Sequence, residues 1–573
     1  MAEVKGADKM KKFLKVAVCS FAAGFLIAGS PIAENFLPKV SAAYQGEIIA
    51  APNVAVVSTR AGKLQGYIHK GIYNYKGVQY AKAERFMPPQ KIDSWSGIKT
   101  AINYGKVAPQ LIDEKNDIFP PHWYSPHWEP RNYPQSEDCQ NLNIWTPNIN
   151  DGKKRPVMVW LHGGGYFMGS AQVEDVYDGE NLARKGDVVV VSINHRLNSL
   201  GFLDLSAYGE KYKTSANNGI LDIVAALEWI QENIENFGGD KNNVTLFGQS
   251  GGGAKILSLT AMPAAKNLFH KMIIQSGSVE NMGMTLPTQE TSRRVAELTL
   301  QNLNLSAAEV DKLQKISYAE LSAAANKAYL QASKEFGAEK MYQGDIGWSP
   351  IIDGEIILQN PVTDGFSENA KNIPLLIGTV ANEWTTINLW QKMEIAQTDN
   401  KNNWTDEQIE QKLREKFGAN TEKIKSAFRE AYPNKPIANA LYVDSWQRTR
   451  AVKTAKIKSD QAAPVYNYIF AWETPIMGGF AMAYHCSEIP FAFNNIELSA
   501  EATGATKNAY ALAEKISQAW INFARTGNPN TQELPKWEKF TRESGATMIF
   551  DDKSALRYHH DENLMKILEP NYK

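Results

Sequence analysis

The sequence predicts an α/β fold with a large, mostly parallel central sheet that helices cover on both faces. The first observation is a series of short apolar runs, each fit for a buried strand, at residues 155–161, 187–193, 244–247 and 271–274. The second is a helical pattern between residues 218 and 237, where Ile220, Leu227 and Ile234 recur at helical spacing. Strands that alternate with helices along a chain form a parallel sheet between two helical layers.

Two polar segments with helical patterns, residues 288–344 and 402–432, interrupt this alternation and are expected to be helical insertions over the sheet. Thr405 and Gln408 form a potential capping box at the start of the second segment. No linker separates a second domain in the sequence, so residues 44–573 are expected to form a single domain. Residues 120–133 are rich in proline and aromatic residues and are expected to form a surface loop. This loop either rims a pocket or is a solvent-exposed loop whose side chains pack on the surface.

The composition is that of an ordinary globular protein, with 43% hydrophobic and 21% charged residues and a formal net charge of −1 over 573 residues. Because the chain has no global basic excess, no nucleic-acid partner is expected.

The N-terminus has the pattern of a secretory signal. Lysines at positions 11, 12 and 15 precede the apolar residues 16–29, and the small residues 41–43 follow. The apolar stretch is short for a membrane span, so residues 1–43 are expected to be removed, leaving an extracytoplasmic protein, secreted or periplasmic, with no stable membrane span. The alternative is a protein that an uncleaved N-terminal segment anchors to the membrane.

Directly after the run at 244–247 stands Gly248-Gln249-Ser250-Gly251-Gly252-Gly253. A serine among glycines can be a filler or a helix cap in a tight turn. It can also be the G-x-S-x-G nucleophile elbow of α/β-hydrolases, with Gly248, Ser250 and Gly252 at the motif positions. The elbow requires a strand before it and a helix after it, and the pattern supplies both, the helix at residues 254–260.

A serine nucleophile also needs an oxyanion hole, a base and an acid. His162-Gly163-Gly164-Gly165 follows the run at 155–161 and has the pattern of an oxyanion loop, with the backbone N–H groups of Gly164, Gly165 and Gly251 as expected donors. The base must come well after the elbow, and only His485, His559 and His560 lie more than ~30 residues downstream of it. The last two lie in a charged stretch near the C-terminus and are expected at the surface. For the acid, Glu383 follows the apolar run 374–378, while Asp353 is a rival that also fits a turn.

Many ordered motifs between about residues 62 and 537 resemble those of the type-B carboxylesterases, the carboxylesterase and cholinesterase family. The segments that carry the resemblance are residues 77–89, 136–144, 194–203, 218–240 and 524–529. The resemblance implies Ser250 as the nucleophile, Glu383 as the acid and His485 as the base. Glu383 stands where the family has the glutamate of its N-x-D-E-G motif, which favours it over Asp353.

The sequence departs from the family pattern at several positions. Gln249 and Gly251 replace the Glu and Ala of the common G-E-S-A-G elbow, and the loss of the negative charge argues against cationic, choline-type substrates. Trp384 and Cys486 stand where the family usually has glycine. Cys139 keeps a family position, and with Cys486 it forms the one pair of the mature chain that could bridge.

The sequence therefore predicts a serine carboxylesterase that acts on a small-molecule ester through an acyl-enzyme and requires no metal or cofactor. One alternative is a specialised esterase of the same family, for a carbamate, a lactone or an aromatic acyl group, whose pocket would include some of Trp123, Trp128 and Trp384. The other is a non-catalytic, cholinesterase-like binding protein, but such proteins typically lack a triad member.

Overall fold

The computed structural model describes residues 48–110, 133–280, 284–337, 348–385 and 399–570. The signal segment predicted at 1–43, most of the loop predicted at 120–133, and Trp123 and Trp128 lie outside these residues. The chain divides into a small unit, Met1–Ile49 with His69–Gly71, and a large unit, Ala50–Ile68 with Ile72–Lys573. In the small unit the structure describes the short strand β1 (Ile48–Ile49) and the turn at His69–Gly71.

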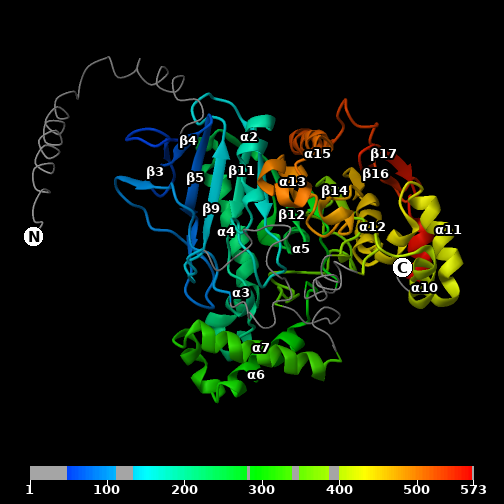
Figure 1. Ribbon diagram of the computed structural model, residues 1–573. Coiled ribbons are helices and arrows are strands. Elements are labelled where there is room, and N and C mark those ends of the chain that lie inside the picture. Colours follow the sequence, from blue (N-terminus) through cyan, green and yellow to red (C-terminus); the bar gives the residue numbers. More distant parts are fainter. Residues whose placement is uncertain (1–47, 111–132, 281–283, 338–347, 386–398, 571–573) are drawn as a thin grey trace, which may run out of the picture. The chain divides into compact units, whose positions relative to one another are not determined.

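The large unit is built on a mixed sheet whose centre is parallel (Figure 1). Its strands follow the order β5-β9-β11-β10-β12-β13-β14-β15-β16-β17. From β11 to β16 every neighbouring pair is parallel, whereas β5, β9 and β17 pair antiparallel at the two sides. The strand bounds are β5 (Ile72–Gln79), β9 (Asn141–Thr146), β10 (Arg155–Leu161), β11 (Val189–Ile193), β12 (Gly239–Gln249), β13 (Lys271–Gln275), β14 (Leu375–Val380), β15 (Val465–Phe470), β16 (Ala546–Phe550) and β17 (Ala555–Tyr558).

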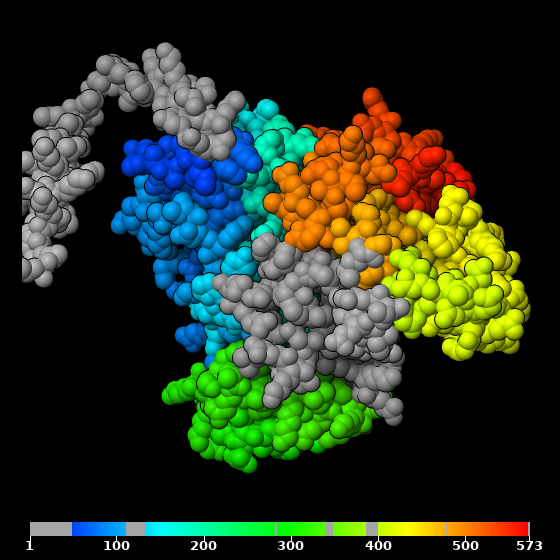
Figure 2. Space-filling model, in the orientation of Figure 1, coloured from blue at the N-terminus to red at the C-terminus, as the bar shows by residue number. Residues whose placement is uncertain are grey.

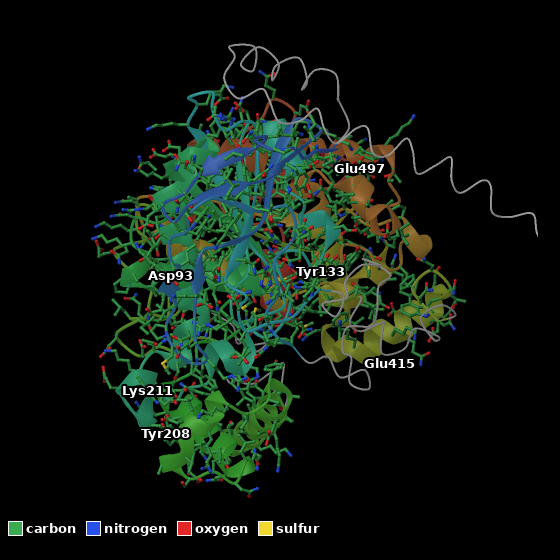
Figure 3. The ribbon with its side chains drawn as sticks, turned by 90° about the vertical axis from the view of Figure 1, so that its left-hand side faces the viewer. Asp93, Tyr133, Tyr208, Lys211, Glu415 and Glu497 are labelled. Carbon is green, nitrogen blue, oxygen red and sulfur yellow. The ribbon has the colours of Figure 1, made fainter. Side chains whose placement is uncertain are left out.

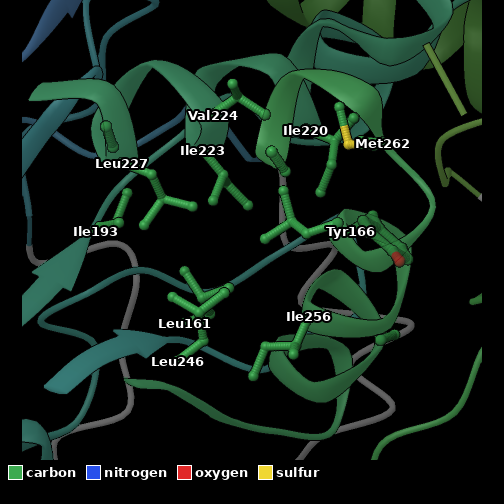
Figure 4. Packing of buried hydrophobic residues seen from close by; sticks show 14 of the residues in the cluster. Leu161, Tyr166, Ile193, Ile220, Ile223, Val224, Leu227, Leu246, Ile256 and Met262 are labelled. Carbon is green, nitrogen blue, oxygen red and sulfur yellow. The ribbon is translucent and has the colours of Figure 1, made fainter. Parts of the chain in front are cut away.

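Alternate residues of a strand enter two different cores, which confirms the sheet covered on both faces. In β10, Val157, Val159 and Leu161 pack with the helices α4 (Asn218–Asn233) and α5 (Gly251–Thr260), and Figure 4 shows part of that cluster. Met158 and Trp160 point to the opposite face and pack with α15 (Lys507–Thr526).

The insertions are helical, as predicted. The first contains α6 (Gln289–Asn302) and α7 (Tyr318–Glu335), which pack against each other. Asp311 of this insertion accepts hydrogen bonds from Lys211 and from Tyr212 at 2.7 Å each, and Lys211 is labelled in Figure 3. The second contains α10 (Asp406–Phe417) and α11 (Thr421–Ala431), and the capping box of Thr405 and Gln408 is present at the start of α10.

The C-terminal helix α16 (Glu562–Leu568) packs against α11, and Figure 2 shows the C-terminal surface, in red, bordering the yellow surface of this insertion. Within the ranges that the structure describes, no helix is long and apolar enough to span a bilayer.

Two strands begin two or more residues away from the start of the apolar run that indicates them. The second strand begins at Val189 rather than at 187, because Asp187 adopts a left-handed conformation with φ 44° where α2 (Glu180–Gly186) ends. Strand β12 begins at Gly239 rather than at 244, because Gly239 already pairs with Arg155 of β10; a register shift follows, and the pairing resumes at Val244.

Candidate active site

The carboxyl ends of the parallel strands bring the predicted site residues to one edge of the sheet. The register pairs Leu161 with Gly248, and Gln249 with Gln275. The glycine loop that follows Leu161 and the serine that follows Gln249 therefore leave the sheet side by side. Glu383 comes three residues after the end of β14, at the same edge. This edge is where open α/β sheets bind ligands.

Ser250 lies at the sharp turn between β12 and α5. Its backbone has φ 56° and ψ −123°, a region that residues other than glycine rarely adopt and that concentrates at functional sites. The Ser250 N–H donates to Gln275 O at 2.8 Å, which holds the turn to the next strand. A Cβ on Gly252 would lie 1.9 Å from Leu161 O, so only glycine allows α5 to start this close to β10. The geometry is that of the predicted nucleophile elbow.

His485 and Glu383 form a direct pair. His485 Nδ1 lies 2.5 Å from Glu383 Oε2, and the backbone N–H of His485 donates to Glu383 O at 3.0 Å. Glu383 is fully buried, and its other carboxylate oxygen accepts the N–H of Val380 at 3.1 Å. Burial lowers the pKa of His485, but the charge of Glu383 and the hydrogen bond to it, with further contributions from Glu488 and Asp444, outweigh burial, so the pKa is raised.

The rivals of these two residues lie elsewhere. Asp353 accepts the N–H groups of Glu355, Ile356 and Ile357 through one carboxylate oxygen, which makes it a turn residue. His559 is partly exposed, as expected, and pairs with Glu562. His560 departs from the expectation of a surface residue, because its ring packs edge-on against Tyr432 and burial lowers its pKa to about 4.

The glycine loop packs against the start of α5. Gly164 and Gly165 both have positive φ, 83° and 59°. A Cβ on Gly251 would lie 2.3 Å from Gly165 O and 2.5 Å from Gly165 N. The three expected donors are therefore gathered beside Ser250, and the loop approaches so closely that an alanine at position 251 would collide with it.

Gln249 contacts the catalytic candidates in a way that sequence reasoning did not foresee. Its amide Nε2 lies 3.2 Å from His485 Nε2, and its Oε1 accepts a hydrogen bond from the Cys486 thiol at 3.2 Å. In the part of the chain that the structure describes, Ser250 Oγ makes no hydrogen bond with His485. The same amide nitrogen also lies 3.4 Å from His485 Nδ1, so it packs against the imidazole ring and does not lie along the lone pair of Nε2.

Further groups surround His485. The Trp384 ring stacks on the imidazole with centroids 5.1 Å apart, and its indole N–H donates to Asp444 at 3.1 Å. Burial and the charge of Glu383 raise the pKa of Asp444, and that of Glu488, to about 7. The only indication of these neighbouring groups in the sequence was the position of Glu488, three residues after His485.

Cys139 and Cys486 are both free, so the bridge that the sequence allowed is not formed in the structure. Burial, followed by the charge of Glu488, raises the pKa of the Cys486 thiol well above its ordinary value, so it stays protonated and donates to Gln249.

A mostly parallel sheet between helical layers, with a serine at a strained strand-to-helix turn and a histidine–carboxylate pair at the same edge, defines an α/β-hydrolase. The model of the carboxylesterase family matches residues 53–567, and the chain belongs to this family. It is accordingly a carboxylic ester hydrolase.

Several known proteins match this chain over most or nearly all of their length. The para-nitrobenzyl esterase of Bacillus subtilis is 33% identical over 529 residues, covering 90% of this chain and 99% of that protein. The human cocaine esterase is 30% identical, covering 87% of this chain and 88% of that protein. Among solved structures, an esterase from Clostridium hathewayi superposes with a TM-score of 0.82 at 37% identity, covering 91% of this chain and 99% of that chain. A para-nitrobenzyl esterase structure gives a TM-score of 0.68 at 32% identity and covers 90% of this chain and 99% of that one.

Proposed function

We propose that the protein is a serine carboxylesterase that hydrolyses esters through an acyl-enzyme, with Ser250 as nucleophile, His485 as base and Glu383 as the orienting acid. The observation that carries this proposal is the 2.5 Å pair of His485 Nδ1 and Glu383 Oε2, at the sheet edge where Ser250 holds its strained conformation. This pair favours the imidazole tautomer that carries its proton on Nδ1 and leaves Nε2 free to accept another.

In the first half of the reaction, the Ser250 hydroxyl donates a hydrogen bond to His485 Nε2. Ser250 Oγ attacks the ester carbonyl while its proton passes to His485 Nε2. The N–H groups of Gly164, Gly165 and Gly251 hold the oxyanion. Glu383 stabilises the imidazolium, which then protonates the leaving alcohol.

In the second half, a water molecule takes the place of the alcohol. His485 accepts a proton from this water as it attacks the acyl-enzyme, and then returns a proton to Ser250 as the acid product leaves. The same oxyanion donors act in both halves.

A covalent inhibitor tests the proposal directly. Diethyl p-nitrophenyl phosphate should release one equivalent of p-nitrophenolate per protein, and the diethylphosphoryl mass should map to the peptide that contains Ser250. The Ser250→Ala variant should release none. An adduct on another residue, or stoichiometric release by the variant, would contradict the assignment of the nucleophile.

Aromatic esters are a second, narrower candidate substrate class. The Clostridium hathewayi relative is described as hydrolysing aliphatic aromatic polyesters. In this chain the indole of Trp384, stacked on His485, offers a flat apolar surface beside the reacting atoms. A comparison of p-nitrophenyl benzoate with p-nitrophenyl butyrate tests it: a higher kcat/KM for the benzoate supports aromatic preference, and a large preference for the butyrate contradicts it.

For the N-terminus we propose export with removal of residues 1–43, on the basic, apolar and small-residue pattern of that segment. The intact mass of protein recovered outside the cytoplasm tests this. A mass that lacks about the first 43 residues supports export and cleavage, and full-length protein confined to the membrane fraction supports the anchored alternative.

A further inference from the structure

A buried lysine lies directly behind the glycine loop and has no part in the mechanism above. Lys255 stands on α5, five residues after Ser250, and is fully buried. Its Nζ donates to His162 O at 2.9 Å, and its ammonium lies 5.9 Å from the centroid of the Tyr166 ring. Within the described part of the chain it forms no ion pair. A lysine buried without a carboxylate costs stability, so its retention in the core needs a reason.

The carbonyl that Lys255 binds belongs to the peptide that opens the glycine loop. This peptide joins His162 to Gly163, and Gly163 lies against the nucleophile: a Cβ there would be 3.2 Å from Gln249 O and 3.5 Å from Ser250 Cβ. At the other side of the loop, the Tyr166 hydroxyl bonds to Ser258 Oγ at 2.8 Å, also on α5. Lys255 and Ser258 thus fasten both ends of the loop to the helix that Ser250 begins.

The surroundings of Lys255 contain cationic or neutral groups rather than anions. His162 and His195 stack with ring centroids 5.2 Å apart, and burial, followed by the charge of Lys255, lowers the pKa of both well below the ordinary range. Arg196, next to His195, is paired with Asp222 at 2.7 Å. Among the residues that the structure describes, no carboxylate pairs with the Lys255 ammonium, and its field extends to the loop.

We propose that Lys255 is a positioning residue of ester hydrolysis, which fixes the base of the oxyanion loop and adds a buried positive charge behind the oxyanion. The inference rests on the proposed function, because it assumes that the loop binds an oxyanion. A charge in a water-excluded interior acts more strongly than one in solvent, and it favours the transition state over the neutral ester. Loss of the Lys255 charge should therefore lower kcat and leave KM nearly unchanged.

The charge of Lys255 depends on pH in the working range of an esterase. Burial lowers its pKa to about 7, so the ammonium is complete below that pH and is lost above it. The neutral amine can still donate to His162 O. The positioning contribution therefore persists at alkaline pH, whereas the electrostatic contribution fades.

The test compares kcat and KM of wild type and Lys255→Met for p-nitrophenyl butyrate from pH 6 to pH 9. At pH 6 we expect kcat to fall about tenfold, less than the 10²–10³ lost with a direct oxyanion donor, and KM to stay within about twofold. The ratio of wild-type to variant kcat should shrink toward pH 9. Lys255→Gln keeps a hydrogen-bond donor but carries no charge. The part of its kcat loss that depends on pH should therefore equal that of Lys255→Met.

Lys458→Met is the matched control. Lys458 is also fully buried and also donates to backbone carbonyls, those of Ala370 and Lys371, but it lies on α12 (Trp446–Ser459). Its replacement should leave kcat unchanged. Melting temperatures monitor folding: Lys255→Met should keep or raise the value, because it removes a buried amine.

Three results would overturn the inference: an unchanged kcat in folded Lys255→Met, a loss that is the same from pH 6 to pH 9, or a loss confined to KM. Ser250→Ala, measured in parallel, separates the two proposals. Activity that survives in Ser250→Ala overturns the proposed function and the role of Lys255 with it. If activity is lost in Ser250→Ala but kcat is unchanged in Lys255→Met, only the inference about Lys255 is overturned.

Discussion

Gln249 Nε2 lies 3.2 Å from His485 Nε2, the atom that accepts the Ser250 proton in the proposed mechanism, and 3.4 Å from His485 Nδ1. The amide therefore packs against the imidazole ring, while the contact of Nδ1 with Glu383 favours the tautomer that carries its proton on Nδ1. The Cys486 thiol fixes the amide from its other end. Gln249 therefore helps to fix the position of the imidazole beside Glu383.

The first prediction concerns the charge at position 249. In Gln249→Glu a carboxylate faces His485 and favours the imidazolium, so the pKa of His485 rises further. The base is active when neutral, and the acid limb of kcat/KM for p-nitrophenyl butyrate should therefore move to higher pH. Relative turnover of a cationic thiocholine ester should increase. Gln301→Glu, an exposed change on α6, adds the same charge and should change neither property; an unmoved acid limb in Gln249→Glu would contradict the contact.

The second prediction concerns Glu383. The pKa of His485 lies above its ordinary value of 6.5 because the contributions of Glu383 and its neighbours outweigh burial. Glu383→Gln removes the largest of these contributions, so the acid limb of kcat/KM should move to lower pH. Because the tautomer is no longer fixed, kcat should fall by roughly 10⁴.

Asp353→Asn is the control for this experiment, since Asp353 was the rival acid in the sequence. It should affect folding stability at most, because that carboxylate serves a turn. If Asp353→Asn abolished activity while Glu383→Gln did not, the assignment of the acid would be wrong.

The third prediction concerns the glycine after the nucleophile. In Gly251→Ala the new Cβ would lie 2.3 Å from Gly165 O, so the loop or the helix must shift. Displacing the donors should lower kcat by about 10²–10³ while KM changes little. Gly152→Ala is the control: its φ of 70° makes alanine cost about 1–2 kcal/mol of stability, but no atom lies within 4 Å of the new Cβ and kcat should stay the same. Equal kcat in Gly251→Ala and wild type would contradict the close packing.

The sequence allowed prediction of those parts of the fold and site that short-range patterns carry. Apolar runs marked β10, β12, β13 and β14, and the glycine-rich segments after β10 and β12 identified the elbow and the loop. His485 and Glu383 followed from chain order and from the resemblance to a family. Each of these depends on neighbours within a few positions.

The contacts of Gln249 and Lys255 could not be predicted in the same way. Gln249 meets His485 across 236 positions of the chain, and only the folded sheet edge brings them together. The role of Lys255 depends on a carbonyl 93 positions earlier. Its one signal in the sequence was a single charge in the otherwise uncharged helix Gly251–Thr260, a pattern that equally fits a residue on a solvated face.

The most direct test of the central claim is hydrolysis of p-nitrophenyl esters from acetate to laurate by wild type and by Ser250→Ala. The account predicts turnover by the wild type that peaks at short acyl chains, and no more than about 10³–10⁴ over the reaction in water for the variant. Equal activity in both proteins would show that Ser250 is not the nucleophile. No turnover of any ester by well-folded wild type would contradict the proposed carboxylesterase.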